Sequence, residues 1–165
     1  MINQQSQHRL QTVRKTSATG QTYPKDELFS IEMLMMLYLS QWSSKIAVEG
    51  IQWSWQFGYS DAGPNAVVTG TPAQPPTLYL PQGEKVRFTI TSNDVVHGLW
   101  IPAFMIQMQN LPGVENHVEF TANKLGEFPG RCNILCGRAH SQMLFKVKVV
   151  SPADYQAYIN SVKAA

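Results

Sequence analysis

The chain has 165 residues, of which 44% are hydrophobic and 15% are charged, and its formal net charge is +2. This length suits one domain of ordinary size with an extension, and the low charged content suits a protein that buries part of its surface against a partner. There is no basic field of the kind that binds nucleic acid, so no nucleic-acid partner is expected.

Residues 1–25 are interpreted as a polar basic tail. They contain four basic residues and no acidic residue, and they show no apolar periodicity. The same composition is compatible with a mitochondrial transit peptide, so that alternative stays open.

Residues 26–47 are predicted to contain an apolar helix. Leu, Met and Glu favour a helix, and Asp26 and Glu27 suit its N-terminal dipole. The apolar stretch is short for a spanning helix, which needs about 20 mostly apolar residues. Three interpretations remain: a core helix packed on the domain, a short membrane anchor, or a helix resting on a membrane partner. Basic residues before it and Trp42 after it suit an anchor with the domain outside.

Residues 51–165 have the pattern of an all-β domain with a short C-terminal helix. Four aromatic residues alternate with small or polar ones, which predicts a strand with all four on one face; they are Trp53, Trp55, Phe57 and Tyr59. Further strands are predicted over 77–80, 85–91, 114–121, 126–132 and 143–150. Ser151 and Pro152 then form a helix start, and the helix is predicted to run to about residue 161. Many short strands between turns indicate a β-sandwich or barrel.

The segment from Cys132 to Met143 carries the most informative chemistry. Its order is Cys-x3-Cys-x3-His-x2-Met, with Cys136 and His140 as the inner members, and it holds both cysteines of the chain. Thiolate and thioether are soft ligands, which favour copper over magnesium, calcium or manganese. A mononuclear blue-copper site uses one cysteine, so this segment has one thiolate too many. Two thiolates with two histidines could instead bridge two copper ions.

The second histidine must come from elsewhere, and His97 is the best candidate. It lies where a β-branched run meets Gly98, whereas His8 lies in the polar tail and His117 in an alternating strand, where both are expected to be solvated. Three other interpretations of the cysteine segment stay open. They are a disulfide across a very short loop, a zinc site of two Cys and two His, and two inert buried cysteines.

These residues together resemble the copper domain of subunit II of the heme–copper oxidases (cytochrome c oxidase). The resemblance runs from about Ile51 to Ile159. It rests on the aromatic segment 52–59, on the Asp94-Val95-Val96-His97 run, on 111–113 and on 132–143. With the strand pattern, it implies a Greek-key cupredoxin sandwich.

The resemblance also implies a binuclear copper centre of the kind called CuA. In it both cysteines bridge two copper ions, and His97 and His140 each bind one. Met143 and the backbone carbonyl of Ile134 are weak axial ligands. Trp53 resembles the tryptophan through which electrons enter, although a core position on the aromatic strand stays open for it. Asp94 resembles a docking carboxylate, although a simply solvated position beside a turn stays open for it.

Several positions depart from the common pattern of the family. Subunit II usually has two membrane helices before its copper domain, and residues 26–47 offer at most one. Ile134 stands where the family commonly has a glutamate that also binds magnesium, so a magnesium site is in doubt. Gln109 and Val114 replace an aspartate and an arginine that many relatives have. The copper ligands are unaffected.

The function implied is that of an electron-input subunit of a terminal oxidase, part of an oxidoreductase and not catalytic alone. It would take electrons from cytochrome c or a small copper protein and pass them to heme in subunit I, within a membrane complex that has further subunits. The copper domain would lie on the outer face, which is periplasmic or extracytoplasmic in a prokaryote and faces the intermembrane space in a mitochondrion. A face near the copper loop that includes Gln109, Met105 and Met108 is expected to meet the heme subunit. Two alternatives are a copper domain like that of nitrous oxide reductase and a free-standing copper carrier.

Overall fold

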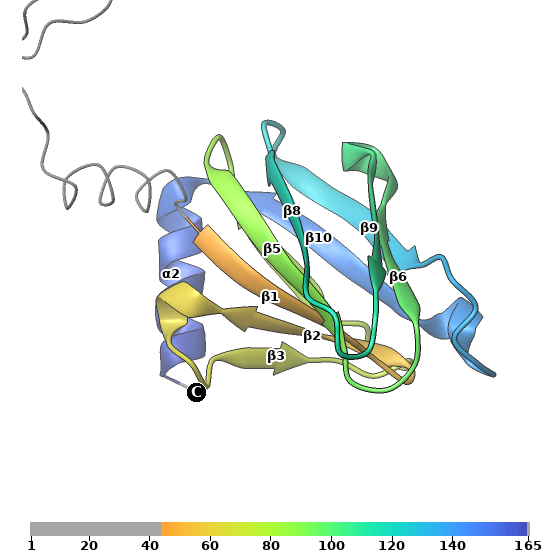
Figure 1. Ribbon diagram of the computed structural model, residues 1–165. Helices are drawn as coiled ribbons and strands as arrows, with labels where there is room; N and C mark the ends of the chain where they lie inside the picture. The colour runs from red at the N-terminus through yellow and green to blue at the C-terminus, as the bar shows by residue number, and fades with distance from the viewer. Residues whose placement is uncertain (1–43, 165) are drawn as a thin grey trace, which may run out of the picture. The chain divides into compact units, whose positions relative to one another are not determined.

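The computed structural model describes residues 44–164. The predicted tail over 1–25 and most of the predicted apolar helix over 26–47 lie outside the described residues. Ten strands and one α-helix make up the described domain (Figure 1). The strands are β1 (Ser44–Ile51), β2 (Ser54–Tyr59), β3 (Val67–Thr69), β4 (Thr77–Pro81), β5 (Lys85–Ser92), β6 (His97–Ile101), β7 (Ile106–Asn110), β8 (Asn116–Thr121), β9 (Gly126–Cys132) and β10 (Leu144–Val150). The helices are α2 (Pro152–Lys163) and three short 3-10 helices, η2 (Ser60–Ala62), η3 (Pro102–Phe104) and η4 (His140–Gln142).

The strands form two five-stranded sheets that enclose one core. The first has the order β3-β2-β1-β5-β8, and the second has the order β4-β10-β9-β6-β7. Pairing is antiparallel except for β1 with β5 and β4 with β10, which are parallel. The chain crosses between the sheets repeatedly, so the loops at each end gather segments that are distant in sequence. The predicted all-β sandwich with a short C-terminal helix is confirmed.

Alternation of side chains along the strands fills the space between the sheets. On β5 the residues Val86, Phe88 and Ile90 are fully buried, as the period-two pattern predicts. Aromatic rings link the two sheets: Phe145 of β10 lies edge-on to Trp55 at 5.2 Å and to Phe57 at 5.6 Å between ring centroids. Such edge-to-face contacts are favourable beyond the apolar area that they bury.

Strand β1 corrects one sequence-based boundary. Residues 44–47 were assigned to the end of the apolar helix, but they are paired with β5 and β2 at the centre of the first sheet. That assignment is therefore wrong for these four residues. The reason is visible in the sequence, because Ile46 and Val48 are buried while Lys45 and Ala47 are exposed, which is strand alternation.

The C-terminal helix begins as predicted. Ser151 caps it, its hydroxyl accepting a hydrogen bond from the backbone N–H of Asp154 at 3.1 Å, and Pro152 occupies the first turn. Tyr155 and Ile159 turn inward and attach the helix to the sandwich. Within residues 44–164, no helix has both the length and the apolar character needed to cross a membrane.

Candidate metal centre

The predicted ligand residues gather at one end of the second sheet, where β10, β9 and β6 are neighbours. Strands β6, β9 and β10 run side by side in this sheet (Figure 1). His97 is the first residue of β6, Cys132 is the last residue of β9, and Met143 directly precedes β10. The register pairs Leu99 of β6 with Cys132 of β9, so His97 lies only two residues further along. Strand pairing therefore joins ligands that are distant in sequence.

Cys136 is the centre of the donor cluster. Its Sγ lies 3.8 Å from Sγ of Cys132, 3.6 Å from Nδ1 of His140 and 3.7 Å from Sδ of Met143. Both cysteines are free and buried, and Met143 is fully buried. Two sulfurs, a thioether and an imidazole nitrogen thus lie within contact distance inside the protein.

Two further donors complete the predicted set. The carbonyl oxygen of Ile134 lies 3.2 Å from Sγ of Cys132. The donor atoms of His97, Cys132 and Cys136 all lie within 4.8 Å of one another. The structure therefore brings together every residue that the sequence analysis proposed as a ligand.

The imidazole of His97 is held by Asp94. Nε2 of the ring lies 2.7 Å from Oδ1 of Asp94, and the ring is completely buried. An ionised carboxylate only accepts hydrogen bonds, so Nε2 carries the proton and Nδ1 is the basic nitrogen. Nδ1 is buried and has no hydrogen-bond partner in the described residues. A buried acceptor without a partner is costly, and binding a metal ion would satisfy it.

The two thiols differ in acidity. Burial raises the pKa of Cys132, but the His97 ring and backbone groups of Gly98 and Ile134 outweigh it, so the pKa lies below that of an ordinary thiol. Burial, followed by the charge on Cys132, raises the pKa of Cys136 above the ordinary value. Cys132 is therefore the more acidic thiol of the pair. A bound cation would displace the thiol protons, since metal ligands must be deprotonated.

Two glycines allow the backbone to approach the ligands closely. A Cβ on Gly50 of β1 would lie 2.8 Å from Cδ2 of His97. A Cβ on Gly98 would overlap Oδ1 of Asn133 and would lie 2.9 Å from Cγ1 of Ile134. The sequence analysis missed both roles, because they depend on which strands are neighbours.

Trp53 lies in the turn between β1 and β2 and not on the strand that follows. The prediction that four aromatic residues share one strand face is therefore wrong for Trp53, while Trp55, Phe57 and Tyr59 are buried on β2 as expected. The indole Nε1 of Trp53 donates a hydrogen bond to the carbonyl oxygen of Cys136 at 3.1 Å. The half-buried indole is thus hydrogen-bonded to the loop between β9 and β10, here called the cysteine loop.

Gln52, the other turn residue, contacts both sides of the site. Its side-chain Nε2 donates to the carbonyl oxygen of Cys136 at 2.8 Å, and its backbone N–H donates to Oδ2 of Asp94 at 2.6 Å. The sequence analysis quoted Gln52 only as part of the aromatic segment. Asp94 was interpreted as a docking or solvated carboxylate, and its spacing three residues before His97 was the signal for its contact with the ring.

The donor set is suited to a soft, redox-active ion. Thiolate, thioether and imidazole favour copper, and the number of thiolates exceeds what a mononuclear blue-copper site uses. Paired strand ends hold His97, Cys132 and Met143, while Cys136 and His140 lie in the loop between β9 and β10.

Comparison with known proteins agrees with this chemistry. Residues 74–150 match the family model described as cytochrome c oxidase subunit II, periplasmic domain. This segment of the domain belongs to that family. The probable cytochrome c oxidase subunit 2 of Streptomyces coelicolor is 48% identical over 94 residues, which are 57% of this chain and 29% of that protein. The chain thus spans less than a third of that relative's length.

Two solved structures of subunit II domains have the same fold. The periplasmic domain of subunit II of cytochrome oxidase from Bradyrhizobium japonicum has a TM-score of 0.65 and 27% identity, with 74% of this chain and 94% of that chain covered. A mixed disulfide between a thioredoxin-like protein and subunit II of cytochrome c oxidase has a TM-score of 0.66 and 27% identity, with 74% and 92% covered. The likeness extends over most of the described residues.

Not every residue proposed near the subunit II copper loop lies there. Gln109 pairs with Gly98 and is exposed beside the loop. Met108 is partly buried against the core, and Met105 is 93% exposed in the connection between β6 and β7, at the far end of β6 from His97. The expectation that Met105 lies near the cysteine segment is therefore wrong, because the hairpin of β6 and β7 carries it away from the site.

His117, the remaining histidine among the described residues, is not part of the cluster. His117 is exposed on β8, with Nε2 3.2 Å from Oε1 of Glu115, and His8 lies outside the described residues. Val114 is 47% exposed and forms an isolated bridge with Leu111.

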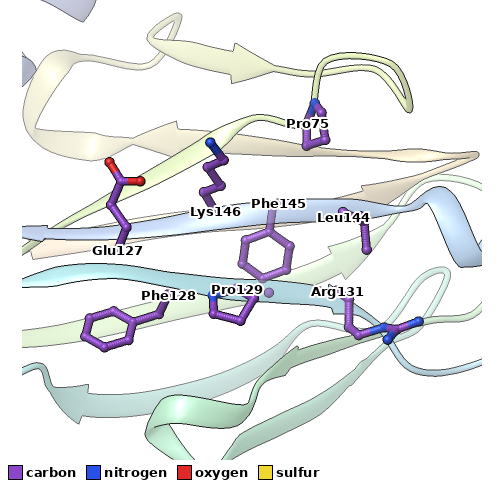
Figure 2. A pocket seen from close by; sticks show the side chains of 9 residues that line it. Pro75, Glu127, Phe128, Pro129, Arg131, Leu144, Phe145 and Lys146 are labelled. Atoms are coloured by element: carbon purple, nitrogen blue, oxygen red, sulfur yellow. The ribbon is translucent and has the colours of Figure 1, made fainter.

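A separate groove lies on the outer face of β9 and β10, with a volume of about 420 Å³ (Figure 2). Pro129 and Leu144 form part of its apolar floor, and Glu127, Arg131 and Lys146 lie around it. None of the proposed metal ligands lines this groove. It is therefore distinct from the candidate metal centre.

Proposed function

We propose that this domain holds two copper ions and serves as the electron-input subunit of a terminal respiratory oxidase. The observation that carries the proposal is the convergence of two thiols, two imidazoles, a thioether and a carbonyl at one end of the sheet, with Nδ1 of His97 buried and unpartnered. Membership of the subunit II family agrees with it.

Each candidate ligand has a proposed role. Cys132, Cys136, His97 and His140 would be the main donors to the copper ions, and Met143 and the carbonyl of Ile134 would be weaker ones. Copper bound there would supply one-electron chemistry. The protein's part is to hold the donors rigidly, to bury them from water, and to keep Nε2 of His97 protonated through Asp94.

Trp53 is the proposed point at which electrons enter the domain. Its indole is half-buried and donates to the carbonyl of Cys136 at 3.1 Å, which gives a short path from the surface to a ligand residue. The donor is a cytochrome c or a small copper protein, and the acceptor is a heme in a subunit I partner. The complex lies in a membrane with this domain on the outer face, and residues 26–43 associate with that partner or with the bilayer.

The thiol pair must be reduced before it can bind copper. The sulfur atoms lie 3.8 Å apart, close enough for oxidation to a disulfide with little movement of the chain. The mixed disulfide formed by a related subunit II with a thioredoxin-like protein suggests that this chain, too, needs a thiol reductant during copper loading.

The first test is metal content. The reduced full-length protein, reconstituted with copper, should hold two copper ions per chain and give an electron paramagnetic resonance spectrum of an electron shared between them. Cys132→Ser and Cys136→Ser should each abolish the shared-electron spectrum. One zinc and no copper after loading under both oxidation states would contradict the proposal.

The second test concerns the partner. Purification in mild detergent should recover the chain together with a heme-bearing subunit. A chain that leaves the membrane fraction as a monomer, with no heme absorbance, would favour a free-standing copper carrier. A chain that co-purifies with nitrous oxide reductase activity would favour that enzyme class instead.

A further inference from the structure

We propose that Gln52 is a positioning residue that joins the cysteine loop to the histidine side of the metal centre. Its backbone N–H donates to Oδ2 of Asp94 at 2.6 Å, and Asp94 in turn holds His97 at 2.7 Å. Its side-chain amide donates to the carbonyl oxygen of Cys136 at 2.8 Å. One residue therefore contacts both Cys136 and the carboxylate that holds His97.

The topology gives this contact its importance. His97, Cys132 and Met143 all lie at strand ends of the second sheet, whereas Gln52 and Trp53 form the β1–β2 turn of the first sheet. The turn thus reaches the loop from the opposite sheet. Nε2 of Gln52 and Nε1 of Trp53 share one acceptor, the Cys136 carbonyl, and together they can satisfy both lone pairs.

Gly137 is an independent indication that the turn and the loop are fitted to each other. Its φ is +123°, a conformation that side chains other than glycine rarely adopt. A Cβ on Gly137 would lie 2.9 Å from Nε1 of Trp53 and 3.1 Å from Nε2 of Gln52. The loop backbone at Gly137 therefore lies against the two donor nitrogens and leaves no room for a side chain there.

The consequence is positional control of the Cys136 sulfur. Fixing the carbonyl of this residue fixes its Cα, and through it the distances of about 3.6–3.8 Å from Sγ to His140, Met143 and Cys132. A methionine at position 52 has similar length but no N–H donor, so it would fill the space without holding the loop. The inference deepens the proposed electron-transfer site and relies on it for functional meaning, although the contact itself involves only protein atoms.

The test is hydrogen exchange of the metal-free, reduced full-length protein. Gln52→Met should speed exchange of amides in residues 133–138 by about fivefold, the change expected for loss of one ordinary hydrogen bond. Gln107→Met is the matched control, because Gln107 is an exposed residue on β7. Amides of β5 serve as an internal reference. Equal acceleration in β5, or no acceleration in 133–138, would overturn the proposal.

A double-mutant cycle sharpens this test. Because Gln52 and Trp53 donate to the same oxygen, either single variant keeps one donor, and Gln52→Met with Trp53→Phe should accelerate loop exchange by more than the product of the single effects. If the acceleration in the double variant equals the product of the two single effects, the two donors do not act on a shared position. In copper-loaded protein, Gln52→Met should shift the hyperfine pattern of the copper resonance while Gln107→Met leaves it unchanged. Failure of wild-type protein to bind copper would contradict the proposed function and leave the exchange result to decide the role of Gln52.

Discussion

Nε2 of His97 lies 2.7 Å from Oδ1 of Asp94, three residues earlier in the chain. The same carboxylate also accepts backbone N–H groups of Val95 and Gln52, each at 2.6 Å. Asp94 therefore fixes the orientation of the ring and decides which nitrogen faces the sulfurs. It acts on the metal centre without being a ligand.

We expect Asp94→Asn to weaken copper binding by about 10- to 100-fold, the usual effect of losing a partner of a ligating histidine. In place of one carboxylate oxygen, the Asn side chain would present an NH2 group to an N–H from which the carboxylate now accepts a hydrogen bond. Two donors would then face each other, so the His97 ring would lose its fixed orientation. Competition with a chelator of known affinity measures the change. Asp61→Asn in η2 is the control for charge, and equal affinities in the two variants would contradict this role.

Gly50→Ala should displace the His97 ring. The added methyl would lie 2.8 Å from Cδ2 of the ring, which cannot move away because it is buried. We expect a loss of roughly 1–3 kcal/mol in the free energy of unfolding, together with weaker copper binding. Gly58→Ala is the matched control, since its methyl would meet Ala47 at an ordinary 3.4 Å. Denaturant titration of both variants would show no difference if the contact were unimportant.

Ile134→Glu should leave the copper stoichiometry unchanged. The proposed ligand atom at this position is the backbone carbonyl, and its side chain packs over Gly98. Elemental analysis should still give two copper ions per chain, with a modest loss of stability of about 1 kcal/mol. Leu135→Glu is the control, because it adds the same charge at the neighbouring residue, which is 80% exposed. Loss of copper in Ile134→Glu alone would show that its side chain matters to the site.

The buried Tyr155 of α2 predicts sensitivity to alkali. Burial raises the pKa of Tyr155 above its ordinary value of 10.0, because the phenolate is disfavoured inside the protein. The contribution of protonated Tyr155 to the free energy of unfolding is complete below the pKa of this residue in the unfolded chain. It is lost as the pH rises from there toward the pKa of the residue in the folded protein. Tyr155→Phe should therefore flatten the fall in unfolding free energy above about pH 10. Thermal melts from pH 8 to 11 provide the measurement, and parallel curves for both proteins would contradict the expectation.

The cluster of candidate donors could be predicted mainly because the identity and spacing of most of its members are local. Four soft or borderline donors lie between Cys132 and Met143, and the fifth, His97, begins a strand whose register with β9 brings it to the same place. The strands over residues 85–91 and 126–132 were also predictable, since their alternation is clear. Such features depend on neighbours in sequence.

The surroundings of the ligands could not be predicted in the same way. The bond from Gln52 to Asp94 joins residues 42 apart, and Gly50 meets His97 only because β1 lies at the centre of the first sheet. Trp53 belongs to an alternating aromatic pattern that is typical of one continuous strand, but the turn formed by Gln52 and Trp53 separates β1 from β2. These contacts are set by sheet pairing, which a single sequence does not specify.

Three candidate ligands, His97, Cys132 and Met143, lie at or beside the ends of strands that are already joined by backbone hydrogen bonds, with β9 between β6 and β10. Copper would therefore cross-link strands that are in register before it arrives, and its added constraint would fall mainly on the loop between β9 and β10. Biogenesis should then proceed in a fixed order, with folding first and metallation second, so that a copper-delivering protein meets a finished receiving surface and not a nascent chain. Under copper limitation, a cell would accumulate folded, thiol-bearing domain instead of clearing an unfolded one.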